Sequence, residues 1–258
     1  MLQVHPVPAF SDNYLWVIHN GRDAAVVDPG DARPVIDYLA VHGLSLAAIL
    51  CTHHHADHVG GVEPLLDFLE LRGQIPVFGP AGERIPARTQ ALREGDQVVI
   101  PQLPLELKVL DVPGHTAGHI AYAGSDMLFC GDTLFACGCG RLFEGTAAQM
   151  TSSLAKLKSL PGHTRVYCAH EYTMANIRFA EAVEPGNADL ELRKAFCGAK
   201  RHRNEPTLPS TISLELATNP FLRLDAPAVI AAASRRAGRA LSRDEEIFAE
   251  IREWKNHF

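Results

Sequence analysis

One loop constrains the fold of this chain more than any other feature: the run T-H-H-H-A-D-H at residues 52–58. The apolar stretch before it, 47–51, predicts a strand, and the stretch after it, 61–71, predicts a helix. Loops at strand ends are where rigid scaffolds present functional side chains. Extended backbone points His53 and His55 to one side, and the turn into the helix directs Asp57 and His58 to a neighbouring point. One segment can therefore supply ligands to two metal ions.

Short β-branched stretches alternate with helical ones up to His170, and glycine or proline marks each boundary. The predicted strands are 15–18, 24–27, 47–51, 76–78, 97–100, 105–110, 119–122, 127–130 and 165–168. The predicted helices of this part are 33–42, 61–71 and 147–160. Thr146 and Gln149 form a capping box at the start of the last helix. Many strands with few helices indicate stacked sheets, so residues 1–170 are expected to form one α/β domain.

The chain changes character after Glu171, where helical patterns joined by proline-rich loops take over. The predicted helices are 173–183, 188–203, 226–237 and 243–254. Ser242 and Glu245 suggest a second capping box, before the last of these helices. Residues 171–258 are therefore expected to form a helical second domain.

The net charge of -6 lies entirely in the part up to His170, which argues against non-specific nucleic-acid binding. No segment has the roughly 18 apolar residues that a membrane helix needs, and the opening residues do not resemble an export signal. The six cysteines are too few for a disulfide scaffold in a chain of 258 residues. We expect a soluble cytoplasmic protein with reduced thiols.

Further candidate ligands follow other predicted strands: His115, Asp132 and His170. Asp28 also ends a strand, and we expect it to orient a ligand. Cysteines stand two residues before His53, Asp132 and His170. They are interpreted as small buried side chains rather than as extra thiolate ligands, and the CxC pair at 137–139 as part of a loop wall rather than as a redox centre.

The run at 52–58 resembles the HxHxDH signature of the metallo-β-lactamase superfamily, and His115, Asp132 and His170 match its downstream ligand positions. The resemblance implies a four-layer αββα sandwich with a binuclear metal centre. One metal is then bound by His53, His55 and His115, and the other by Asp57, His58 and His170. Asp132 bridges the two metals, and His54 points elsewhere. Zinc is expected, although iron and manganese suit the same ligands.

Several segments are more specifically similar to the glyoxalase II, or hydroxyacylglutathione hydrolase, family: 10–14, 131–135, 138–146, 170–173 and 218–223. The resemblance covers essentially the whole chain and implies that the helical domain, 171–258, binds glutathione. Arg252 and Lys255, three apart on a helix, would hold the glycine carboxylate. Tyr172, Arg141 and Phe143 would complete the site. Animal and plant members have lysine and tyrosine where this chain has Arg141 and Phe143, so one hydroxyl donor is lost.

The implied reaction is hydrolysis of S-D-lactoylglutathione and related 2-hydroxyacylglutathiones to D-lactate and glutathione, the second step of methylglyoxal detoxification. A hydroxide that bridges the metals attacks the thioester, with Asp132 and Asp57 as the expected catalytic carboxylates. The enzyme is expected to be a monomer with no nucleic-acid or membrane partner.

Three alternatives remain at this stage. A persulfide dioxygenase would use one iron and lack most of the helical domain. An RNA-processing nuclease would need a basic insertion. A non-enzymatic binding protein would not need all seven ligand positions.

Overall fold

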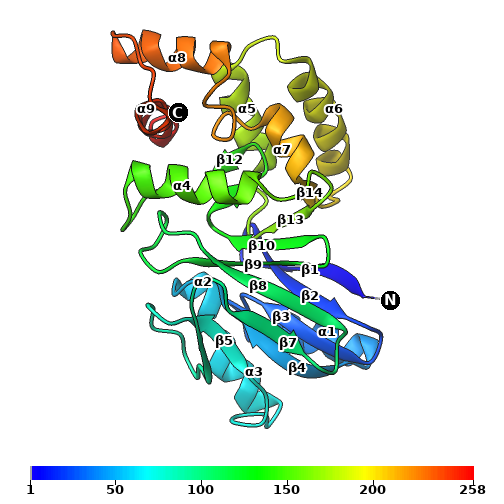
Figure 1. Cartoon of the computed structure of the whole chain (residues 1–258). Coiled ribbons are helices and arrows are strands. Elements are labelled where there is room, and N and C mark those ends of the chain that lie inside the picture. Colours follow the sequence, from blue (N-terminus) through cyan, green and yellow to red (C-terminus); the bar gives the residue numbers. More distant parts are fainter. Residues whose placement is uncertain (1) are drawn as a thin grey trace. The chain divides into compact units, whose positions relative to one another are not determined.

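The computed structural model describes residues 2–258 and divides into two compact units (Figure 1). The first unit runs to Asp111 and includes Gly118–Gly131. The second unit consists of Val112–Ala117 and Asp132–Phe258. No helix of the described residues is both long enough and apolar enough to cross a membrane.

A six-stranded sheet forms the first part of unit 1, with its strands in chain order. They are β1 (Gln3–Ala9), β2 (Asn13–His19), β3 (Asp23–Val27), β4 (Ser45–Leu50), β5 (Val77–Pro80) and β6 (Gln90–Leu92). The pairs from β1 to β3 are antiparallel, whereas those from β3 to β6 are parallel. The strands β3 and β4 therefore end at the same edge, where Asp28 and the histidine loop follow them.

Four antiparallel strands form the second part of unit 1: β7 (Gln97–Ile100), β8 (Leu105–Asp111), β9 (Ile120–Gly124) and β10 (Met127–Gly131). The hydroxyl of the buried Tyr122, on β9, donates to the carbonyl oxygen of Cys51 at 2.8 Å. The backbone nitrogen of Ile120 donates to Thr52 at 3.0 Å. These bonds fix β9 beside the start of the histidine loop.

The helices of unit 1 are α1 (Ala32–His42), the single turn α2 (Ala56–Val59) and α3 (Val62–Phe68). The apolar faces of α1 and α3 pack on the six-stranded sheet, where Val35, Leu39, Val62 and Leu65 are buried together. The side chain of Asp31 caps α1, and Gly43 ends it in the left-handed conformation that glycine adopts without strain. α2 lies inside the histidine loop and turns Asp57 and His58 away from the strand direction.

Unit 2 contains the short hairpin of β11 (Leu134–Phe135) and β12 (Gly138–Cys139), and the pair of β13 (Arg165–Cys168) and β14 (Ser210–Thr211). Its helices are α4 (Ala147–Lys158), α5 (Thr173–Val183), α6 (Ala188–His202), α7 (Ile212–Thr218), α8 (Pro227–Ala237) and α9 (Asp244–Asn256). Aromatic rings from α5, α9 and the segment after α7 pack together, with Phe221 between Phe179 and Phe248.

Every predicted strand and helix has a counterpart in the structure, and the capping box of Thr146 and Gln149 is confirmed. The capping box of Ser242 and Glu245 is wrong. Arg243 is the N-cap of α9 and makes no capping bond with its side chain. Glu245 forms an ion pair with Arg243 instead, and three acidic residues in the first turn favour the positive end of the helix dipole.

Candidate metal centre and substrate cavity

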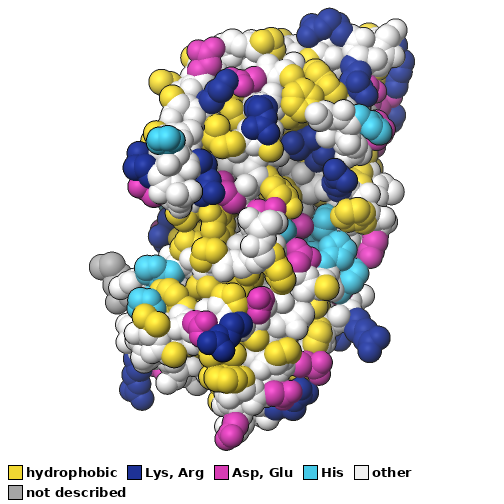
Figure 2. Space-filling view, turned by 180° about the vertical axis from the view of Figure 1, so that it is seen from behind, with side chains coloured by type: hydrophobic (Ala, Val, Ile, Leu, Met, Phe, Trp, Pro, Cys, Tyr) yellow, Lys and Arg dark blue, Asp and Glu magenta, His cyan; other side chains and the backbone are white. Residues whose placement is uncertain are grey.

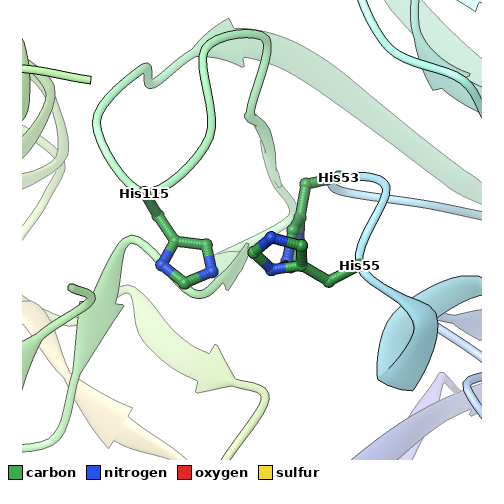
Figure 3. Close-up of side chains that lie close together, drawn as sticks. All are labelled: His53, His55 and His115. Carbon is green, nitrogen blue, oxygen red and sulfur yellow. Dashed lines mark hydrogen bonds between the residues drawn. The ribbon is translucent and has the colours of Figure 1, made fainter. Parts of the chain in front are cut away.

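One candidate cluster of metal ligands is the histidine loop of unit 1. The buried His53 and the half-buried His55 bring their rings face to edge, with Nε2 of His53 3.1 Å from Nδ1 of His55. Figure 3 shows these two side chains, and also that of His115, which follows β8. Histidine side chains gather in one place on the face seen in Figure 2.

Asp28 organises this cluster, as the sequence predicted. It is buried, and it accepts hydrogen bonds from the backbone nitrogen and the hydroxyl of Thr52, both at 2.7 Å. Its Oδ2 also lies 3.1 Å from Nδ1 of His58. Because a carboxylate only accepts, Nδ1 of His58 carries the proton and Nε2 presents a lone pair.

The tautomer of His53 follows from the same contacts. The hydroxyl proton of Thr52 is used by Asp28, so the oxygen of Thr52 can only accept from Nδ1 of His53, 3.1 Å away. Nε2 of His53 therefore also presents a lone pair. The buried carboxylate of Asp28 thus fixes the tautomers of His53 and His58, so that each can bind a cation through Nε2.

A second candidate cluster of metal ligands lies in unit 2. The two oxygens of Asp132 face different imidazoles: Oδ2 lies 3.4 Å from Nε2 of His115, and Oδ1 lies 3.3 Å from Nε2 of His170. Nδ1 of His115 donates to the carbonyl oxygen of Arg141 at 2.9 Å, so its Nε2 presents a lone pair towards Asp132. This is the arrangement that a bridging carboxylate needs.

Both clusters suit a divalent metal ion. In unit 1 the lone pair of His58 faces Oδ2 of Asp57 at 3.4 Å, and in unit 2 that of His115 faces Asp132 at the same distance. Two acceptors at this separation repel one another unless a proton or a cation lies between them. Buried imidazoles with carboxylates are the donors that zinc, iron and manganese share.

His54 serves a different contact, as expected for the middle histidine of the motif. Its Nδ1 lies 2.9 Å from Oε2 of Glu83, whose other oxygen accepts from the backbone nitrogen of Gly118 at 3.0 Å. The His54 ring is thus used to tie the loop to a neighbouring segment of unit 1.

A cavity of about 480 Å³ lies in unit 2. His115 and Asp132 line it. All five residues that the sequence assigned to the substrate also line it: Arg141, Phe143, Tyr172, Arg252 and Lys255. These five side chains are separated by up to 114 positions in the sequence, yet the structure brings them to one cavity.

Three cationic side chains line this cavity: Arg141, Arg252 and Lys255. The buried Arg252 has its guanidinium 5.3 Å from the centre of the Phe221 ring, and its Nε has no hydrogen-bond partner among the described residues. Nζ of Lys255 lies 5.0 Å from the centre of the Phe179 ring. Burial, together with the charges of Arg252, Arg141 and Arg178, lowers the pKa of Lys255 to about 8. An anion in this cavity would relieve that repulsion.

Aromatic rings connect the two ends of the cavity. Tyr172 stacks on His170 with ring centres 4.8 Å apart, and the exposed Phe143 meets the His115 ring edge-on at 5.2 Å. Cys139, interpreted from the sequence as part of a loop wall, also lines the cavity, as do Phe135 and Asn176, which sequence reasoning missed. Asn176 lies on a helix that was predicted, but nothing in the local pattern sets it apart from a solvent-facing residue.

The six cysteines are buried and unpaired with one another. Burial raises the pKa of Cys51, Cys168 and Cys139, and that of Cys137 to about 12. All six are small buried side chains of the core, as the sequence indicated.

Comparison with known proteins agrees with these observations. The family model "Metallo-beta-lactamase superfamily" matches residues 10–170, and "Hydroxyacylglutathione hydrolase C-terminus" matches residues 171–258. A hydroxyacylglutathione hydrolase of Nitrosomonas europaea is 57% identical over 258 residues, which cover 100% of this chain and 97% of the relative.

Solved structures share the fold. ETHE1 from Myxococcus xanthus has a TM-score of 0.67 and 26% identity, over 98% of this chain and 91% of its own. TTHA1623, solved in a di-iron-bound form, has a TM-score of 0.59 and 27% identity, over 84% of this chain and 100% of its own. The fold class predicted from the sequence is confirmed. The chain belongs to the hydroxyacylglutathione hydrolase family, within the metallo-β-lactamase superfamily.

Proposed function

We propose that this protein hydrolyses S-D-lactoylglutathione, and related 2-hydroxyacylglutathiones, to D-lactate and glutathione. The observation that carries the proposal is the cavity of unit 2, which places Asp132 and His115 together with a cluster of cations in one space. Glutathione thioesters combine a reactive carbonyl with distant carboxylates, and this cavity offers a partner for each. The full-length similarity to a hydroxyacylglutathione hydrolase points to the same reaction.

The residues that would hold two metal ions are His53, His55, Asp57, His58, His115, Asp132 and His170. Bound there, divalent ions would lower the pKa of a water molecule and polarise the thioester carbonyl. We propose zinc as the native metal. Iron is the main alternative, because the related TTHA1623 was solved in a di-iron-bound form.

The side chains have separate tasks in the proposed reaction. Asp132 would hold both metal ions, and the carboxylate of Asp57 would accept a proton from the water molecule that attacks the thioester. Asn13 holds Asp57 in place, donating to Oδ2 at 3.1 Å. The leaving thiolate has a pKa of roughly 8.5 and departs without a general acid.

Substrate binding is assigned to the cationic end of the cavity. Arg252 and Lys255 bind the glycine carboxylate of glutathione, while Tyr172, Arg141 and Phe143 contact the rest of the peptide. The chain is then divided at residue 170 into a metal-binding part and a glutathione-binding part, the position where the two family models meet. A single chain lines the whole cavity, so a monomer suffices. Its reduced thiols suit the cytoplasm.

The test is thioester hydrolysis by purified protein, followed as thiol release from lactoyl-, acetyl- and mandeloylglutathione, with the metal content measured in parallel. We expect hydrolysis that is lost with a chelator and restored by a divalent metal. Absence of thiol release from metal-loaded protein would refute the proposal. Oxygen uptake with glutathione persulfide, measured on the same samples, would identify a dioxygenase instead.

A further inference from the structure

The hairpin of β11 and β12, residues 134–139, stands between two parts of the site. Asp132 precedes it by two residues and Arg141 follows it by two. Phe135 on β11 and Cys139 on β12 line the cavity. Its tip at Cys137 adopts a positive φ of 54°, a conformation that side chains other than glycine rarely take.

Side chains of the C-terminal helical part bind the backbone of this hairpin at each residue from Phe135 to Cys139. Asn219 donates from Nδ2 to the carbonyl oxygens of Phe135 at 3.1 Å and of Gly138 at 2.9 Å. Asn176 donates to Ala136 at 2.9 Å and Arg252 donates to Cys139 at 2.8 Å. Oε2 of Glu215 accepts from the backbone nitrogen of Cys137 at 2.8 Å.

Asn219 is itself held rigidly. It is fully buried, its Oδ1 accepts from the backbone nitrogen of Phe221 at 3.0 Å, and its Nδ2 also contacts Oε2 of Glu215 at 3.0 Å. Glu215 is fully buried too, and it is paired with the buried Arg193 at 2.5 Å. The hairpin is thus hydrogen-bonded to a buried polar network. Each member of this network is held in place because a buried polar group needs its partner.

Close packing links the position of the hairpin to the positions of Asp132 and Arg141. A Cβ on Gly138 would lie 2.6 Å from Nδ2 of Asn176, and a Cβ on Gly140 would lie 1.9 Å from the carbonyl oxygen of Asp132. The backbone nitrogen of Gly140 donates to Thr133 at 3.2 Å. A shift of the hairpin therefore moves the backbone on which Asp132 and Arg141 stand.

We infer that Asn219 is a positioning residue of the active site, which sets the places of Asp132 and Arg141 through its bonds to the hairpin. Asn219 does not line the cavity, so it acts on the reaction only through these residues. The kinetic test of this inference rests on the proposed function, whereas the hydrogen-exchange test does not.

The experiment compares Asn219→Ala with a matched control, Asn187→Ala. Asn187 makes similar bonds within the helical part: its Nδ2 donates to Glu184 and to the carbonyl oxygen of Ala217, both at 3.0 Å, and it caps α6. Both variants are expected to lower the melting temperature. Only Asn219→Ala should lower kcat and raise KM for lactoylglutathione, each by roughly tenfold or more, because misplacing catalytic groups by about 1 Å costs up to a hundredfold in rate.

Hydrogen exchange gives a second readout that needs no activity. In Asn219→Ala the backbone amides of residues 132–141 should exchange faster than in the parent protein, whereas in Asn187→Ala they should not. If the parent protein hydrolyses no thioester, the proposed function fails, and the exchange of this segment still decides the inference. Unchanged exchange there, or kinetic constants of Asn219→Ala that equal those of the control, would overturn it.

Discussion

Arg252 donates from Nη1 to the carbonyl oxygen of Cys139 at 2.8 Å, and so it supports the cavity wall as well as facing the cavity. Lys255, one turn further along α9, contacts the ring of Phe179. From the sequence, the two cations were expected to act as an equivalent pair. Because of this difference in contacts, we expect their removal to have different effects on KM and kcat.

Lys255→Ala is expected to raise KM for lactoylglutathione and to leave kcat unchanged, because the glycine carboxylate does not change during hydrolysis. A charge-assisted hydrogen bond of about 1.5 kcal/mol corresponds to an increase of roughly tenfold. Arg252→Ala should raise KM and also lower kcat, since it frees one end of the hairpin. Steady-state kinetics on both variants, with a thioester lacking the glycine carboxylate as control substrate, checks the difference. Equal effects on kcat would contradict it.

The affinity for substrate should depend on pH through Lys255. Its pKa in the folded protein is lowered to about 8, so the side chain is charged below that pH and loses its charge as the pH rises through it. KM is therefore expected to rise with pH above about 8, and Lys255→Arg should hold KM level over the same range because arginine stays charged. A measured KM profile of the parent enzyme that is flat from pH 7 to 9.5 would rule out this role.

Replacing Asp132 should affect metal binding and chemistry together. Asp132→Ala removes both oxygens that face His115 and His170, so bound metal should fall to one equivalent or less and hydrolysis should be abolished. Asp37→Ala, on the exposed face of α1 where Asp37 pairs with Arg33, is the control and should keep both. Elemental analysis with thiol-release assays decides the matter. A variant with two metals and substantial activity would remove Asp132 from the bridge.

Replacing His53 and replacing His54 should have very different effects on metal content and activity. His53→Ala is expected to lose metal and activity, because the ring of His53 is fixed by Thr52 to present Nε2. His54→Ala removes the contact with Glu83 but no proposed metal ligand, so activity should stay within about threefold. If the two variants were equally damaged, the faces assigned to the loop would be wrong.

Sequence reasoning located the local elements well, because glycine, proline and hydrophobic periodicity mark them. It missed β1, whose Pro6 and Pro8 argue against a strand, although proline is tolerated on the edge strand that β1 forms. It also missed the short strands β6, β11, β12 and β14, the single turn α2 and the short helix α7, because elements of this length show no clear period.

The candidate site was predictable where ligands follow strands, and not where distant segments meet. The resemblance indicated Arg252 and Lys255, but no local pattern reveals that Asn219 binds the backbone of Phe135, 84 positions away. Hydrogen bonds from side chain to backbone leave no trace in the type of the accepting residue, since every residue has a carbonyl. Such contacts become visible only in three dimensions.

The buried thiol of Cys139 has a consequence for an enzyme that releases glutathione. Cys139 lines the cavity, and burial raises the pKa of its thiol, so the reactive thiolate is scarce at neutral pH. Oxidised glutathione shares the groups that the cavity would bind, and it would lie beside a sulfur that exchanges slowly. Under the proposed function, the enzyme would keep working under oxidative stress without forming mixed disulfides in its own active site.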